Sequence, residues 1–247
     1  MKKAYLGCLK KLRQFRRSIL SDKDIKRGRL YYNWIETKTE KIIHEKNDSY
    51  VYNKVIKYTL PKYTITQYIF NKSNKKVKDI IKANYILKNN KYIYNVKTNI
   101  SKENIELLMK YVLFKRGNVV WIDFGFNIGN EFGGIHPAVI LKYFENELFV
   151  VPISSKKPKE YIELEQKQQE GKITLKECEK KKNCTNEIIE LKRINNFRSM
   201  IRWARISRMK KVSILRVNFG GTIGTLDGED MNIIADKISI ELGNKKH

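Results

Sequence analysis

The stretch RGNVVWIDFGFNIGNEFGGIHPAVILKYFENELFVVPISS, from Arg116 to Ser155, predicts the centre of the fold. Val119–Phe124 is rich in β-branched and aromatic residues and stops at Gly125, a pattern typical of a strand that ends in a turn. Pro137–Phe144 and Glu147–Ile153 are two more apolar runs, and the two residues between them predict a hairpin. We therefore expect three consecutive antiparallel strands here.

The segment between the first two strands combines glycines with polar side chains. Its four glycines are Gly125, Gly129, Gly133 and Gly134, and its polar side chains are Asn127, Asn130, Glu131 and His136. Glycine lets a loop adopt positive φ or approach a ligand closely, and loops held between strands often carry binding or catalytic groups. We therefore expect a functional site at this loop.

This order of residues resembles the MazF/PemK toxins of bacterial type II toxin–antitoxin systems. The family pattern is Arg-Gly-Asp and a strand, then Gly-x-Glu-x-Gly-Gly-x-Arg-Pro, and a strand ending in Pro/Ala-Ile-Thr. The matching residues are 116–118, 129–137 and 152–154, and the likeness runs from Arg116 to the C-terminus. Three positions depart from the pattern: Asn118 replaces an Asp, Ser154 replaces a Thr, and His136 replaces the Arg that the family uses in catalysis.

The resemblance implies an α+β protein with a small SH3-like β-barrel of the MazF/PemK/CcdB type and a C-terminal helix. We expect a basic, mainly helical region at 1–113 and the toxin domain at 114–247, with a polar insertion at about 156–185 that contains a helix from Leu175 to Lys182. After the barrel's third strand we expect strands at 187–191 and 212–217. Asp227 should cap a last helix that Gly243 ends.

The resemblance also implies a metal-independent endoribonuclease that needs no cofactor and cleaves single-stranded RNA at a short sequence, leaving a 2′,3′-cyclic phosphate and a 5′-OH. Such a reaction needs a group that takes the proton of the 2′-OH, donors for the phosphorane and an acid for the leaving oxygen. We assign catalytic roles to His136, Ser154 and Glu131. The implied partners are an acidic antitoxin and a second copy of the barrel in a homodimer.

A second stretch, Phe197–Met209, predicts an RNA-binding strand. It alternates, with Arg202 and Ala204 on one face and Trp203 and Arg205 on the other, and arginine suits bidentate contacts to phosphate. The predicted RNA-binding residues are Arg198, Arg202, Trp203, Arg205, Ser155, Lys156, Asn127 and Asn130.

Two other functions fit the same residues. His136 in place of Arg also fits a branch without cleavage, and the fold includes CcdB-like toxins that bind a protein target. A basic DNA-binding regulator is the third possibility.

The charge of the chain favours a polyanionic partner. Lys and Arg number 51 against 26 Asp and Glu, a formal net charge of +25. Residues 1–113 carry +18 of this excess, with 27 basic and nine acidic residues. An abundance of Lys, Asn, Ile and Tyr is also the usage of an AT-rich genome, so the charge alone does not identify the partner.

Helical periodicity runs through residues 1–20 and on to about His44, and again at 77–87 and 101–109. Residues 49–70 fit a helix or a strand equally well, and so does Tyr92–Tyr94. This region could be an RNA-binding arm, but we expect it to pack against the barrel. Three cysteines and three histidines without paired spacing predict neither a disulfide framework nor a zinc site. The sequence has no apolar run long enough for a membrane span, and we expect a cytoplasmic protein.

Overall fold

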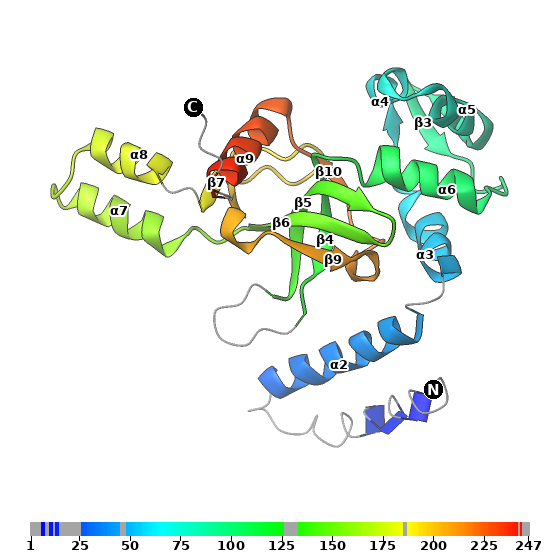
Figure 1. Cartoon of the computed structure of the whole chain (residues 1–247), viewed down its shortest axis with the longest axis horizontal. Coiled ribbons are helices and arrows are strands. Elements are labelled where there is room, and N and C mark those ends of the chain that lie inside the picture. The colour runs from blue at the N-terminus through cyan, green and yellow to red at the C-terminus, as the bar shows by residue number, and fades with distance from the viewer. Residues whose placement is uncertain are drawn as a thin grey trace.

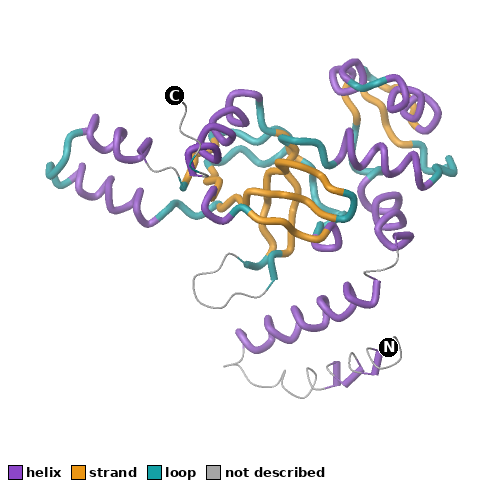
Figure 2. Tube along the Cα trace, in the orientation of Figure 1, coloured by secondary structure: helices purple, strands orange, loops and turns teal. Residues whose placement is uncertain are grey.

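The structure is a computed structural model that describes residues 6–7, 10–11, 13–14, 26–44, 48–125, 133–184, 187–241 and 243. Figure 1 shows its elements along the chain, and Figure 2 separates helices from strands. The described helices are α2 Lys26–His44, α3 Asp48–Lys54, α4 Gln67–Lys72, α5 Lys75–Asn84, α6 Lys102–Leu108, α7 Lys159–Gln169, α8 Leu175–Cys184 and α9 Gly228–Glu241. The described strands are β1 Ile65–Thr66, β2 Tyr85–Lys88, β3 Lys91–Tyr94, β4 Asn118–Asp123, β5 Ile135–Phe144, β6 Glu147–Ser154, β7 Ile188–Leu191, β8 Arg202–Arg205, β9 Lys210–Ser213 and β10 Gly224–Thr225.

The larger sheet is an antiparallel half-barrel. Its strand order is β10-β4-β5-β6-β8-β7, and β9 pairs with the other part of β6. The predicted hairpin joins β5 to β6, with Phe144 opposite Glu147. A register shift between Ile140 and Lys142 lets β5 bend. The expected α+β class, with a small curled barrel and a C-terminal helix, is confirmed.

A smaller antiparallel sheet lies in the N-terminal region, where the sequence predicted mainly helix. Its order is β1-β3-β2, and α4, α5 and α6 lie around it (Figure 1). The predicted helix at 77–87 is wrong at its end, because Tyr85–Lys88 leaves the helix and forms β2. Residues 48–59 are helical, and the ambiguous Tyr92–Tyr94 belongs to β3.

One hydrophobic cluster joins this region to the half-barrel. It contains Val55, Leu60 and Leu108 from the N-terminal side and Ile122 and Leu148 from the sheet, each at most 1% exposed. Burial of this apolar surface is the main stabilising contribution to the contact between the two parts. The expectation that the region packs against the barrel agrees with this cluster for residues 48–113.

Asn118 lies at the point where the two parts meet. Its side chain is fully buried, and its Nδ2 donates hydrogen bonds to the carbonyl oxygens of Val112 and Leu113, both at 2.8 Å. Those carbonyls end the helical turn Met109–Leu113 that follows α6, where carbonyl oxygens lack helical donors. Thr225 Oγ1 donates to Asn118 Oδ1 at 3.3 Å. These bonds explain why residue 118 is Asn and not the Asp of the family pattern, because a carboxylate could not donate to two carbonyls.

The helix α2 contacts the far end of β4. Lys41 Nζ lies 3.0 Å from Asp123 Oδ2, and the Trp34 ring packs against Gly125. A Cβ at Gly125 would lie 2.5 Å from Trp34 Nε1, and the residue has a φ of +90°, so only glycine fits there. The predicted helix up to His44 is confirmed; most of the first predicted helix, residues 1–20, lies outside the described residues.

The C-terminal helix α9 begins and ends as the sequence predicted. Asp227 Oδ1 accepts a hydrogen bond from Asp230 N at 2.8 Å, and Gly243 has a φ of +79° beyond its last turn. Met231 and Ile234 pack on the half-barrel beside Val119 and Val139. In the part of the chain that the structure describes, no helix has both the length and the apolar character of a membrane span.

We expect Asn118→Asp to lower the free energy of unfolding by about 3–5 kcal/mol, because it buries a charge and leaves the carbonyl oxygens of Val112 and Leu113 without their donor. The difference from wild type should shrink at acidic pH, where a protonated carboxyl regains one donor. Urea unfolding at two pH values measures both effects. Asn232→Asp, on the exposed side of α9, is the matched control, and equal stability of the two variants would contradict the role given to Asn118.

Candidate functional site

His136 lies near the start of β5, opposite Ile122 of β4. Its side chain is half-buried, and its Nε2 would lie 3.9 Å from a Cβ at Gly134, so the imidazole lies against the end of the glycine segment. Burial lowers the pKa of His136. A hydrogen bond with the Gly133 backbone raises this pKa, and the positive charge of Lys156 lowers it. The neutral imidazole is therefore favoured at pH 7, and neutral imidazole can accept a proton.

Ser154 ends β6 and begins the turn that carries Lys156. Its Oγ accepts a hydrogen bond from Lys156 N at 3.0 Å and is 3.3 Å from the Lys156 carbonyl oxygen. The β5–β6 register pairs Ala138 with Pro152, and two more steps align His136 with Ser154. Ser155 and Lys156 are exposed. The structure thus brings His136, Ser154 and Lys156 to one end of the β5–β6 pair.

The same row of the sheet continues into β8 and β7. Ser154 pairs with Trp203, and Trp203 pairs with Glu190. Trp203 is only 7% exposed and packs with Tyr161 and Ile188. Its Nε1 is a buried donor with no hydrogen-bond partner among the described residues. Trp203 is therefore covered by protein rather than open to a nucleic-acid base.

The three arginines that the sequence predicts to bind RNA differ in accessibility. Arg202 is 6% exposed, and its Nη1 donates to the Arg198 carbonyl at 3.0 Å. Its guanidinium also lies over the Phe197 ring, 5.4 Å from the centroid, and burial lowers its pKa. Arg198 itself is exposed, and Arg205 is partly so. Of the predicted arginines, Arg198 and Arg205 can reach a ligand, whereas Arg202 stabilises the fold.

The predicted long strand at 197–209 is wrong. Only Arg202–Arg205 forms β8, and Ile206–Arg208 is a 3₁₀ turn. In the segment before β8, the carbonyl oxygens of Arg198 and Met200 accept hydrogen bonds from the Arg202 side chain. These carbonyls are therefore engaged within the segment and do not pair with a neighbouring strand. Within β8 the predicted alternation holds: Arg202 and Ala204 face the core around Ile189, and Trp203 faces Tyr161.

The polar insertion is a pair of helices, α7 and α8 (Figure 1). The predicted helix at 175–182 is confirmed within α8, but α7 was not expected. Glu165 forms salt bridges with Lys157 and with Lys182, the latter at 2.7 Å, and these hydrogen bonds lower the pKa of Glu165. Tyr161, 4% exposed, anchors the pair on Trp203. The polar composition of the insertion gave no sign of this buried contact between Tyr161 and Trp203.

Three predicted site residues, Asn127, Asn130 and Glu131, lie outside the described residues. Glu190 and Tyr161 were missed by the sequence reasoning. Glu190 lies in the same row of the sheet as Ser154, with Trp203 between them, and Tyr161 of α7 packs on Trp203. Both positions depend on contacts between segments far apart in the chain, which no local pattern reveals. Within the described ranges, no three His, Cys, Asp or Glu side chains lie close enough together to hold a metal ion.

We expect Arg202→Gln and Arg198→Gln to have different effects on stability. Arg202→Gln removes a buried charged donor and should lower the free energy of unfolding by about 1.5–3 kcal/mol. Arg198→Gln, at an exposed position, should change it by less than about 0.5 kcal/mol. Chemical denaturation of both proteins measures the difference, and a stable Arg202→Gln protein would overturn this assignment.

The family model described as PemK-like, MazF-like toxin of type II toxin-antitoxin system matches residues 115–242. Among solved structures, MazF (Form-I) from Deinococcus radiodurans is similar over 52% of this chain and 94% of its own, with 13% identity and a TM-score of 0.35. No curated protein matches. Because the family model spans more than half of the chain, this protein belongs to the PemK-like, MazF-like toxins of type II toxin–antitoxin systems.

Proposed function

We propose that this toxin is a metal-independent endoribonuclease that cleaves single-stranded RNA in the cytoplasm to a 2′,3′-cyclic phosphate and a 5′-OH. The observation that carries the proposal is the placement of half-buried His136 beside Gly134 and next to the positive charge of Lys156. This end of the sheet combines a group that can move a proton with a cation that can hold a phosphate.

In this proposal His136 is the general base. Its lowered pKa keeps the imidazole neutral at pH 7, so it can take the proton of the 2′-OH as that oxygen attacks the phosphorus. The P–O5′ bond then breaks, and the leaving 5′ oxygen takes a proton from solvent water to become the 5′-OH. Lys156, exposed one turn beyond Ser154, binds a phosphate oxygen. Ser154 acts as a positioning residue, because its Oγ holds the Lys156 backbone.

Arg198 and the partly exposed Arg205 extend the proposed RNA path along β8. Arg205 pairs with Ile188 at the end of the strand, and Arg198 lies in the loop before it. Arginine donors suit phosphate contacts, which position a nucleic acid without reading its sequence. The roles proposed for Glu131, Asn127 and Asn130 concern residues outside the described part of the chain.

We expect wild-type protein to cleave a defined single-stranded RNA in EDTA, and His136→Ala to do so about 10²–10⁴ times more slowly. The wild-type rate should fall at acidic pH because protonation removes the base, and since burial lowers the pKa of His136, the midpoint of this fall should lie below the ordinary imidazole value of about 6.5. His136→Arg restores charge but cannot accept a proton at neutral pH, so it should stay inactive although folded.

Two results would change the assignment. If His136→Arg is active with a flat pH profile, the histidine acts as a cation in place of the family's Arg. If His136→Ala cleaves as fast as wild type, His136 is not catalytic. A wild-type protein that cleaves no RNA but arrests growth would instead favour the CcdB-like alternative, a toxin that binds a protein target.

The type II family implies an antitoxin partner. We propose that this partner is an acidic segment, since the chain has a net charge of +25, and that the barrel forms a homodimer. Expression of the toxin alone should arrest bacterial growth, and co-expression of an acidic protein encoded by the adjacent gene should relieve the arrest. Harmless expression of a folded, wild-type chain would contradict the toxin role, and light scattering would test the dimer.

A further inference from the structure

Residues 65–94 have the order strand, helix, turn, helix, hairpin. Only Ser73 and Asn74 separate α4 from α5. Each helix has an N-cap: Thr66 Oγ1 accepts a hydrogen bond from Ile69 N at 3.3 Å, and Asn74 Oδ1 accepts one from Val77 N at 2.9 Å. The hairpin β2–β3 follows directly and pairs with β1. This is the element order of a helix-turn-helix followed by a β-hairpin, and in a helix-turn-helix the second helix enters the major groove of DNA.

The second helix, α5, is divided into a buried side and a basic side. Val77, Ile80 and Ile81 pack into the core, at most 6% exposed. The exposed side chains are Lys75, Lys76, Asp79, Lys82 and Ala83. The first turn of α5 therefore exposes two lysines, Lys75 and Lys76. In a helix-turn-helix, this N-terminal end of the second helix is the part that contacts the base edges. Asp79, the one carboxylate of α5, can accept a hydrogen bond from the amino group of cytosine.

The hairpin adds two more exposed lysines. Lys88 and Lys91 face each other across a two-residue turn. Asn89 and Asn90 both have positive φ, +48° and +58°, the conformation of a tight type I′ turn that holds the hairpin rigidly. Residues 48–113 contain 13 lysines and four acidic residues, a net charge of +9. This charge gives the small unit a strongly positive electrostatic potential.

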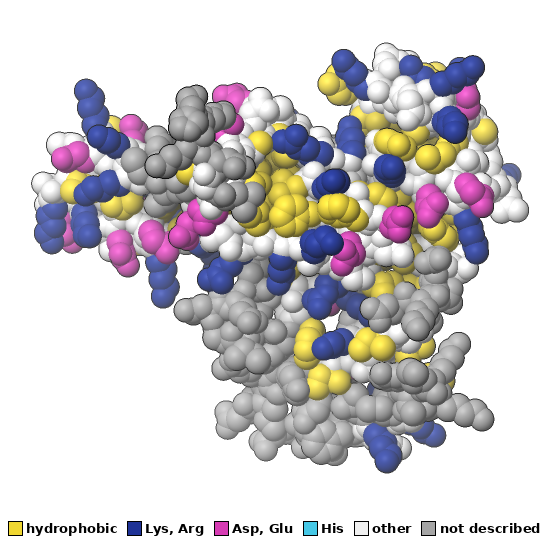
Figure 3. All heavy atoms as spheres, viewed as in Figure 1, with side chains coloured by type: hydrophobic (Ala, Val, Ile, Leu, Met, Phe, Trp, Pro, Cys, Tyr) yellow, Lys and Arg dark blue, Asp and Glu magenta, His cyan; other side chains and the backbone are white. Residues whose placement is uncertain are grey.

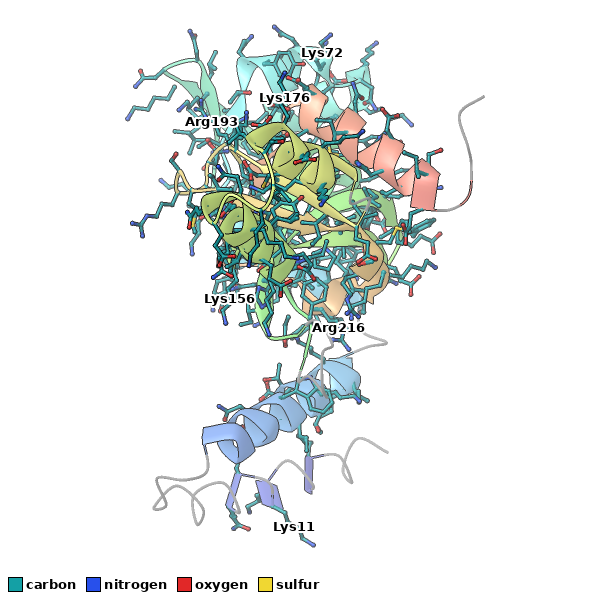
Figure 4. All side chains as sticks on the ribbon, turned by 90° about the vertical axis from the view of Figure 1, so that its left-hand side faces the viewer. Lys11, Lys72, Lys156, Lys176, Arg193 and Arg216 are labelled. Carbon is teal, nitrogen blue, oxygen red and sulfur yellow. The ribbon has the colours of Figure 1, made fainter. Side chains whose placement is uncertain are left out.

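This basic surface lies away from the proposed RNA site. The lobe with α4, α5 and β3 is at the upper right of Figure 1, and dark-blue basic side chains project from it in Figure 3. In Figure 4, Lys72 of α4 is at the top of the molecule, far above Lys156. The two surfaces are therefore separate.

We propose that α4, α5 and the β2–β3 hairpin form a binding site for double-stranded DNA, with α5 in the major groove and Lys88 and Lys91 on the phosphate backbone. The choice of DNA follows from shape. The major groove of B-DNA admits an α-helix, whereas the deep, narrow major groove of duplex RNA does not. This inference does not depend on the proposed RNA cleavage, which uses the other end of the molecule.

The test uses the full chain, because the unit shares its core with the half-barrel. Fluorescence anisotropy measures binding to a mixed-sequence DNA duplex of about 20 base pairs, two turns long, at several salt concentrations. The variant replaces the five lysines at 75, 76, 82, 88 and 91 by Gln. The matched control replaces Lys176, Lys180 and Lys181 by Gln, three exposed lysines of α8 (Lys176 is labelled in Figure 4).

We expect the five-lysine variant to bind DNA at least about tenfold more weakly, with the slope of log K against log salt reduced by about 2–4, because each phosphate contact contributes about 0.9. The α8 control should bind like wild type. Wild type should also bind duplex RNA of the same sequence more weakly than the DNA. Equal binding by wild type and the five-lysine variant, equal losses in the α8 control, or a preference for duplex RNA would each overturn the proposal.

Discussion

The buried amide of Asn118 is the constraint on which the rest of the arrangement depends. It is the first residue of β4, and it holds the last carbonyls of the helical turn Met109–Leu113 while accepting from Thr225 of β10. Three segments are thereby fixed at one point: the end of the N-terminal unit, the first strand and the last strand of the half-barrel. Tyr63, whose burial raises its pKa to about 12, also hydrogen-bonds with this amide. The orientation of the N-terminal unit on the half-barrel is set here.

Much of the half-barrel was predictable because its signals are local. The runs of β-branched residues, the two-residue turn between β5 and β6, and the cap at Asp227 each act within a few residues of chain. The smaller sheet was missed for the opposite reason. Tyr85–Lys88 follows a helix without a breaker, and its strand conformation depends on pairing with β3 and on burial of Tyr85. Tertiary pairing overrides a helical pattern in such a segment.

The site was predictable only in part. His136 and Ser154 were identified from the resemblance, and strand register then places them at the same end of the β5–β6 pair. Arg202 and Trp203 were predicted to touch RNA because arginine and tryptophan commonly do, yet both are buried. Their burial depends on Phe197 and on Tyr161 of the insertion, and such contacts across long sequence separations leave no trace in local composition.

The shared hydrophobic cluster has a consequence for how the chain is made. Its members run from Val51 to Ile223 and include Val212, Ile214 and Val217, which are translated long after the N-terminal unit. Domains fold as units while a chain is being synthesised. The unit of α4, α5 and the β2–β3 hairpin therefore leaves the ribosome before part of the apolar surface that it packs against has been made. The cluster is complete only when nearly the whole chain has emerged, so a chain that ends prematurely lacks part of the core that the N-terminal unit and the half-barrel share.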